Sequence, residues 1–189
     1  MIAEGGAFAD SGAPRHAAEQ NVVENCRRLA DACRTAAVPV IHVWYLVEDG
    51  AKALKPNAPL FAGVREWRPR QRQLGRRAGA GARTPARRPG RREDADERLA
   101  GHEPRVALRG LDRDQVTVTG AWTNMSIEHT ARSGADKGYF MFVPDDCCPT
   151  MNADWHNASI NYALQNVSTV TNCDAVVAAI ARSAPVVRE

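Results

Sequence analysis

The sequence predicts an α/β domain in which a mostly parallel, open β-sheet carries helices on both faces. Short runs of β-branched and apolar residues alternate with stretches of helical periodicity along most of the 189 residues. The connections are short and contain helices, which requires parallel strands joined by right-handed crossovers. With 44% hydrophobic residues the chain can bury one core, so residues 1–189 are predicted to form a single domain.

The first elements are a helix and a strand. An apolar stripe with helical spacing predicts an amphipathic helix over residues 16–36. The residues of the stripe are Val22, Cys26, Leu29, Ala30 and Cys33. The nearly continuous apolar run Val38–Val47 predicts a strand covered on both faces.

The second half of the chain repeats this alternation three times. Strands are predicted at Gln115–Trp122, Tyr139–Val143 and Val167–Thr171, and helices at Asn124–Lys137, Ala153–Gln165 and Asp174–Arg182. Gly138 follows the first of these helices as a C′ residue. Ligands of such sheets bind at the carboxyl ends of the strands, here around Gly120–Ser126, Asp145–Asn152 and the residues after Tyr45.

Charge and cysteine content limit the class of protein. Ten of the 25 basic residues are arginines between residues 68 and 92, so the rest of the chain is acidic, with 15 basic against 22 acidic residues. No apolar run reaches the roughly 18 residues that span a membrane, and no signal peptide is evident, which predicts a cytoplasmic protein. Five cysteines without metal-ligand spacing predict reduced thiols and no metal; Cys26 and Cys33 are expected to be buried on one helix face.

The most informative stretch is "TGAWTNMSIEHTARSGADKGYFMFVPDDCC", which begins at Thr119. A strand ends at Gly120, a tight turn follows, and a helix begins near Asn124 with Ser126 in its first turn. A hydroxyl at this position lies beside backbone N–H groups at a positive helix end, which suits a nucleophile or an anion.

This stretch resembles the isochorismatase-like hydrolase superfamily, which includes nicotinamidases, N-carbamoylsarcosine amidases and isochorismatases. The resemblance implies a three-layer αβα fold with six parallel strands in the order 3-2-1-4-5-6, a small-molecule substrate, no cofactor and a homo-oligomer. The family's amidases use an Asp, a Lys and a Cys nucleophile. By the same resemblance, the oxyanion hole consists of backbone N–H groups of Trp122 and Ser126, beside a cis peptide between Ala121 and Trp122.

Ser126 stands where the amidases have cysteine. A helix terminus can lower the pKa of a thiol into the neutral range but not that of a hydroxyl, so nucleophilic attack by Ser126 requires a positioned base. His129, one turn away, is a candidate base, but surface exposure or core packing is the better interpretation. Isochorismatases also lack the thiol and act without a covalent intermediate, so a serine is compatible with non-covalent chemistry.

The other two family positions have no counterpart. The Asp ends a first strand that precedes the segment resembling "GGAFADSGAP", and Asp10 lies beyond it, so we expect Met1 to be an internal methionine of a longer ancestral frame. The Lys belongs to the third strand, where none of Lys52, Lys55 and Lys137 falls. The first strand is therefore predicted to be absent and the third disrupted.

Residues 67–107 form the Arg-rich segment that replaces the third strand, and we predict that they are irregular or disordered. A frameshift entered near Arg65 to Arg68 and corrected before Leu108 explains the composition, because a one-base shift permits a strand that ends in a lysine. Two alternatives remain open. A basic nucleic-acid arm is disfavoured because residues 68–92 lack aromatic residues, and a flexible insertion makes the same structural prediction.

Five further residues are predicted to line a substrate pocket: Thr123, Asn124, Asp146, Cys148 and His156. The alternative for Asp146 is to hold the loop, and for His156 helix packing is at least as good an interpretation. For Cys148, packing or pocket lining is favoured over nucleophilic attack. The predicted function is a hydrolase of an amide, carbamoyl or enol-ether bond, impaired in this chain; the alternative is a catalytically dead family member that binds a ligand or partner. Loss of a central strand exposes backbone groups and also predicts low stability.

Overall fold

The computed structural model describes residue 2 and residues 8–43, 55–63 and 108–183. The predicted Arg-rich segment, residues 67–107, lies outside the described residues. So do Tyr45, Lys52 and the second half of the strand predicted at Val38–Val47.

Three parallel strands form the sheet of the described chain: β1 (Gln115–Thr117), β2 (Phe140–Pro144) and β3 (Thr169–Thr171). Their order is β1-β2-β3. Val116 pairs with Met141 across the first ladder, and Val143 pairs with Val170 across the second. The parallel, open sheet is as predicted, and its order matches strands 4-5-6 of the arrangement implied by the family resemblance.

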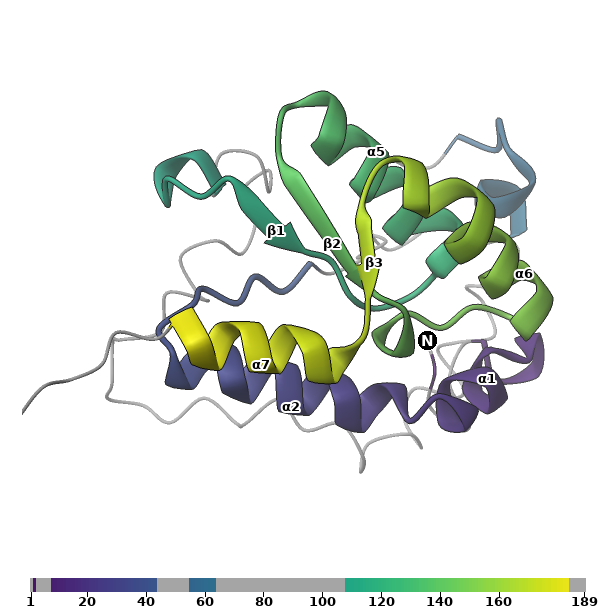
Figure 1. Cartoon of the computed structure of the whole chain (residues 1–189). Coiled ribbons are helices and arrows are strands. Elements are labelled where there is room, and N and C mark those ends of the chain that lie inside the picture. Colours follow the sequence, from purple (N-terminus) through teal and green to yellow (C-terminus); the bar gives the residue numbers. More distant parts are fainter. Residues whose placement is uncertain (1, 3–7, 44–54, 64–107, 184–189) are drawn as a thin grey trace, which may run out of the picture.

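The helices form two layers, one on each side of the strands (Figure 1). Helices α2 (Val22–Thr35) and α7 (Cys173–Ser183) lie side by side on one face. On the other face lie α5 (Glu128–Asp136) and α6 (Ala153–Ala158). The three-layer αβα architecture predicted from the sequence is therefore confirmed.

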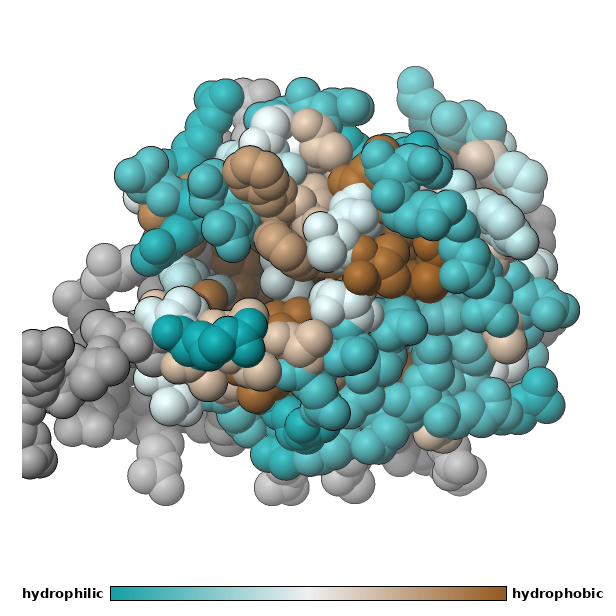
Figure 2. Space-filling view, viewed as in Figure 1, coloured by the Kyte–Doolittle hydropathy of each residue, from teal (hydrophilic) through white to brown (hydrophobic). Residues whose placement is uncertain are grey.

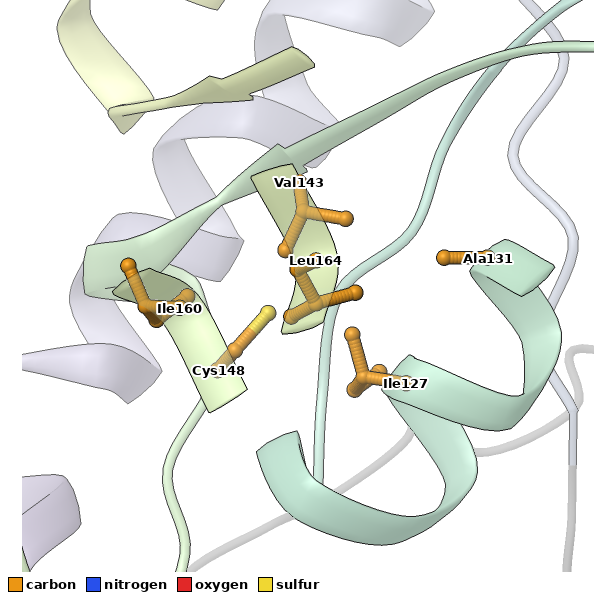
Figure 3. Packing of buried hydrophobic residues seen from close by; sticks show 6 residues of the cluster. All are labelled: Ile127, Ala131, Val143, Cys148, Ile160 and Leu164. Atoms are coloured by element: carbon orange, nitrogen blue, oxygen red, sulfur yellow. The ribbon is translucent and has the colours of Figure 1, made fainter. Parts of the chain in front are cut away.

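Each face of the sheet has its own apolar cluster. Under α5 and the α6 region, Figure 3 shows six buried side chains that point toward one another: Ile127, Ala131, Val143, Cys148, Ile160 and Leu164. On the opposite face, Leu29 of α2 packs with Cys147 and Cys173, and α7 adds partly buried Val176 and Ile180. Apolar stripes at helical spacing account for both clusters.

The helix predicted over residues 16–36 is two helices. Helix α1 (Ala13–Glu19) ends before Gln20, and α2 begins at Val22. Between them Asn21 has φ +53°, a left-handed conformation that ends a helix and that asparagine tolerates better than most residues. The break redirects the chain, so α1 lies near α6 while α2 lies against α7 (Figure 1).

The strand predicted at Val38–Val47 is not present in its described part. Residues 38–43 have no strand assignment, and the side chains of Val38 and Val43 are 41% and 77% exposed. A strand needs a hydrogen-bonded neighbour, and within the described ranges β1 pairs with β2 alone. The prediction assumed a neighbour that the described chain does not supply.

The remaining helices occur where the sequence places them, with local changes of winding. The helix predicted at Asn124–Lys137 begins as a π-helical turn, η4 (Thr123–Ile127), before α5 and ends at Gly138, which has φ +85°. The helix predicted at Ala153–Gln165 consists of α6, the π-turn η6 (Ser159–Ala163) and the 3₁₀ turn η7 (Leu164–Asn166). The first of these π-turns carries Ser126, and π-turns are frequent at functional sites.

The surface differs between the strands and the helices. Figure 2 shows hydrophobic residues gathered in the middle of this face, over the strands, with a largely hydrophilic surface on α1 and α2 and a mixed surface on α7. Phe140, at the start of β2, is 64% exposed. In the described part of the chain, no helix is both long enough and apolar enough to cross a membrane.

Candidate active site

The candidate site lies just beyond β1, which ends at Thr117, short of the strand end predicted at Trp122. Gly120 has φ +102°, a conformation that favours glycine, and its N–H donates to the carbonyl of Cys147 at 3.0 Å. The next peptide bond, between Ala121 and Trp122, is cis, and the N–H of Thr123 donates to the carbonyl of Pro149 at 3.0 Å. The segment after β2 therefore holds both ends of the turn that leads to Ser126.

The Ser126 hydroxyl bridges the cis peptide. Its Oγ donates to the carbonyl of Ala121 at 2.8 Å and accepts from the N–H of Trp122 at 2.9 Å. The structure thus brings together the three residues predicted for the oxyanion hole. The hydroxyl proton points to a carbonyl rather than to a base, and the hydroxyl oxygen occupies the N–H that an oxyanion would need.

An open hollow of about 670 Å³ lies at this turn. Its described walls include Phe8, Leu60, Trp122, Met125, Ser126 and His129. Phe8 meets Trp122 edge to face, with 5.4 Å between the ring centroids, so one wall is apolar. Among the described residues that line the hollow, the acidic and basic side chains are Glu128 and Arg132, which pair at 3.0 Å, and His129.

Of the two residues of the turn that were predicted to line the pocket, Asn124 lines the hollow and Thr123 does not. Asn124 lines the hollow, and its Oδ1 accepts from the Thr150 hydroxyl at 2.6 Å. Thr123 is fully buried, and its hydroxyl donates to the carbonyl of Cys148. Thr123 therefore holds the turn from beneath instead of facing the hollow.

Asp146 and Cys148 also lie away from the described walls of the hollow. The Oδ1 atom of Asp146 accepts from the N–H of Cys173 at 2.8 Å, and its Oδ2 accepts from Asn25 at 3.3 Å. Burial raises the pKa of the Asp146 carboxyl. Cys148 is fully buried in the cluster of Figure 3, and burial raises the pKa of its thiol. Both residues were predicted to line the pocket, and both occupy packed positions because they follow the buried end of β2.

His156 belongs to a buried polar network. Its Nδ1 lies 3.0 Å from the Thr123 hydroxyl oxygen, and its Nε2 lies 3.1 Å from Gln20 Nε2. The His16 ring is 5.2 Å away between centroids, and His16 Nδ1 accepts from the N–H of Thr150 at 3.3 Å. Gln20 and His16 were not predicted from the sequence. They reach His156 because the chain breaks at Asn21, so that α1 turns toward α6; Asn21 is the residue that could have indicated this break.

Comparison with known proteins identifies the family. The model of the isochorismatase domain matches residues 6–175, most of the chain. The chain belongs to the isochorismatase family. Over 80 residues it is 28% identical to the uncharacterized isochorismatase family protein YecD of Escherichia coli O157:H7. That match covers 42% of this chain and 43% of YecD, so it spans less than half of this relative.

Solved structures share the isochorismatase-family fold. A cysteine hydrolase from Pseudomonas syringae pv. phaseolicola 1448A superposes with a TM-score of 0.60 at 20% identity, covering 85% of this chain and 80% of that chain. An isochorismatase family protein from Burkholderia thailandensis gives 0.55 at 19% identity, with 85% and 83% covered. A putative hydrolase of the isochorismatase family from Chromobacterium violaceum ATCC 12472 gives 0.55 at 20% identity, with 84% and 80% covered. At these identities the likeness establishes the fold.

The cysteines of this isochorismatase-family chain are free thiols. Cys26 and Cys33, predicted to be buried, are half-buried on α2, while Cys147, Cys148 and Cys173 are buried. Within the described ranges, no group of three or more His, Cys, Asp or Glu residues is arranged to hold a metal ion.

Alkylation should separate these thiols. A hydrogen bond from the Cys147 thiol lowers the pKa of Cys26, whereas that bond and burial raise the pKa of Cys147. Because the thiolate is the reactive form, we expect iodoacetamide at pH 7.5 to modify Cys26 first and Cys148 only after unfolding. Peptide mass spectrometry over time measures the order, and Cys26→Ser should remove the fast phase. Equal rates at Cys26 and Cys148 would contradict the assignment.

The buried histidines should make stability fall in mild acid. Burial lowers the pKa of both His16 and His156 below the usual 6.5. Arg15 lowers the pKa of His16 further and His16 lowers that of His156, while Glu19 and Asp145 oppose the respective shifts. Below about pH 6.5 the unfolded chain binds protons that the folded chain does not, so the free energy of unfolding should decrease until the folded state is protonated.

Urea unfolding at pH 7.5, 6.5 and 5.5 measures this decrease. A His156→Gln variant should show a shallower fall over that range, because one of the two buried imidazoles is gone. A variant of the exposed His129, His129→Gln, is the matched control and should keep the wild-type slope. An unchanged slope in His156→Gln would show that His156 takes up its proton equally in both states.

Proposed function

We propose that this isochorismatase-family chain carries a small-molecule hydrolase site at the hollow beside Ser126, for an amide, carbamoyl or enol-ether bond, and that the site is impaired. The observation that supports this proposal is the turn from Gly120 to Ser126. The N–H of Trp122 and the hydroxyl of Ser126 meet beyond the carboxyl end of β1, beside an open hollow of about 670 Å³.

The hydrogen bonds of Ser126 support impairment. A substrate oxygen must displace the Ser126 hydroxyl before it can accept from the N–H of Trp122, and this competition weakens oxyanion stabilisation. Within the described chain, no base accepts the proton of this hydroxyl, which instead donates a hydrogen bond to the carbonyl of Ala121. We therefore propose that any hydrolysis proceeds without a covalent intermediate on Ser126.

Proton transfer would then depend on groups at the edge of the hollow. An enol ether needs a proton donor and water rather than an enzyme nucleophile, and Glu128 and His129 are the described titratable side chains that line the hollow with Arg132. An amide additionally needs a nucleophile and an oxyanion site, both of which are compromised at Ser126. Of the reactions considered, hydrolysis of an enol-ether bond is therefore the one most compatible with these residues.

Single-turnover assays test the proposal. With enzyme in excess over nicotinamide, N-carbamoylsarcosine or isochorismate, we expect slow formation of product from at least one of these substrates. Ser126→Ala should not lower that rate by more than about threefold, because the hydroxyl is not a nucleophile and its removal frees the N–H of Trp122, whereas loss of a true nucleophile costs about a hundredfold or more. A hundredfold loss in Ser126→Ala would contradict the non-covalent route.

The second candidate is a catalytically dead member that binds a ligand. The observation that favours it is the absence of Asp and Lys side chains from the described walls of the hollow. No turnover of any probe at stoichiometric enzyme, together with saturable binding of one of them by calorimetry, would support this candidate.

We also propose that the protein is a cytoplasmic homo-oligomer. Cell fractionation tests the location, and light scattering at several protein concentrations tests the oligomeric state.

A further inference from the structure

A buried imidazole, that of His156, contacts the turn that carries Ser126. Thr123 is the first residue of the π-helical turn Thr123–Ile127, and its side chain is completely buried. Its hydroxyl has a single proton, which it donates to the carbonyl of Cys148. Any further hydrogen bond at this hydroxyl must therefore be one that it accepts.

This constraint fixes the state of His156. The Nδ1 atom of His156 lies 3.0 Å from Thr123 Oγ1, so we assign the proton to Nδ1, as the donor of this bond. The Nε2 atom is then the acceptor, and the side-chain amide N–H of Gln20 donates a hydrogen bond to it at 3.1 Å. His156 is only 4% exposed, so water does not compete for either bond.

The network connects three parts of the chain. Gln20 lies at the end of α1, His156 lies on α6, and Thr123 opens the turn of Ser126. Thr123 is three residues from Ser126 within the same five-residue turn, so a shift of Thr123 changes where the Ser126 side chain lies relative to the N–H of Trp122. The contacts of Thr123 are therefore suited to setting the geometry of the candidate site.

We propose that His156 is a positioning residue for the Ser126 turn and that it acts through its Nδ1–H bond to Thr123, not through contact with a substrate. The proposal rests on the proposed function for its catalytic meaning, but its structural content can be tested without a substrate. His156 does not line the described walls of the hollow, in keeping with an indirect role.

A thiol placed at residue 126 provides the test. In Ser126→Cys the thiolate can accept the N–H of Trp122, as the hydroxyl oxygen does, and a correctly placed helix N-terminus favours the thiolate. Iodoacetamide reports this state, because the thiolate sulfur forms a bond to the reagent's methylene carbon as iodide leaves. The rate at residue 126, followed by peptide mass spectrometry between pH 5.5 and 9, gives the thiol pKa.

Two substitutions of His156 in this background separate its two bonds. Asparagine places an amide N–H near the position of Nδ1 and can keep the bond to Thr123, whereas glutamine places its amide near Nε2 and can keep the bond to Gln20. We expect His156→Gln to raise the pKa of the thiol at residue 126 and to slow alkylation at pH 7 by about threefold or more, while His156→Asn stays within about 1.5-fold of the parent.

A stability control distinguishes positioning from general loosening. Leu29 is buried on the opposite face of the sheet, so Leu29→Ala should destabilise the fold without changing the rate at residue 126. Parent-like reactivity in His156→Gln, equal slowing in His156→Asn, or equal slowing in Leu29→Ala would each overturn the proposal. The outcome is separate from the hydrolase assay: no turnover with a His156-dependent thiol refutes only the proposed function, and turnover with a His156-independent thiol refutes only this inference.

Discussion

Replacing Asp146 by alanine should lower the free energy of unfolding by about 2–3 kcal/mol, because the carboxylate joins three elements. Its Oδ1 accepts the N–H of Cys173, the first residue of α7, at 2.8 Å, and its Oδ2 accepts from Asn25 of α2 at 3.3 Å. Alanine leaves the N–H of a buried residue without its acceptor and removes a negative charge from a helix N-terminus. Urea denaturation at pH 7 measures the difference.

Two companion variants make the Asp146 result specific. Asp146→Asn keeps one acceptor oxygen but turns an amide N–H toward the Asn25 amide, so its loss should be smaller than that of alanine. Asp174→Ala breaks the ion pair with Arg28, in which Asp174 is 78% exposed, and should cost less than about 1 kcal/mol. Equal losses in Asp146→Ala and Asp174→Ala would show that Asp146 does not join these elements.

The parts of the fold that depend on local pattern were predictable from the sequence. The apolar runs that predict β2 and β3, and the helical pattern that predicts α7, each follow a period that a single segment displays by itself. The glycine that ends α5 is also a local signal, and Gly138 has the positive φ that it predicts. The placement of Ser126 after a strand end likewise followed from strand, turn and helix in sequence.

The differences between the predictions and the structure involve partners that lie far away in the sequence. The run at Val38–Val47 has strand composition, but pairing is a property of two segments, and residues 38–43 have no partner in the described chain. Whether a polar residue near a strand end lines a pocket or packs inside depends equally on distant groups. Asp146 is hydrogen-bonded to Asn25 and Cys173, and His156 is hydrogen-bonded to Gln20 and Thr123.

Leu164→Ala should also lower the free energy of unfolding, by about 2–5 kcal/mol. Leu164 is fully buried and packs among Ile127, Val143 and Cys148, so it connects η7 with β2 and with the turn of Ser126 (Figure 3). Alanine removes apolar contacts and leaves a cavity that the surrounding strand and helices cannot fully close. Against a total stability of about 5–15 kcal/mol, this loss is large enough to lower the yield of folded protein.

The loss of unfolding free energy at Leu164 should depend on how much side-chain volume the substitution removes. Leu164→Met nearly conserves the volume and should cost less than about 1.5 kcal/mol, while Val23→Ala, at a position 68% exposed on α2, should change stability by no more than about 0.5 kcal/mol. Thermal and urea unfolding of the three variants measure the order. Because Ile127 of the Ser126 turn packs against this cluster, Leu164→Ala should also loosen that turn, which a higher rate of amide hydrogen exchange at residues 123–127 would show. A stability loss in Leu164→Ala no greater than that in Val23→Ala would mean that this cluster does not hold the sheet to α5 and α6.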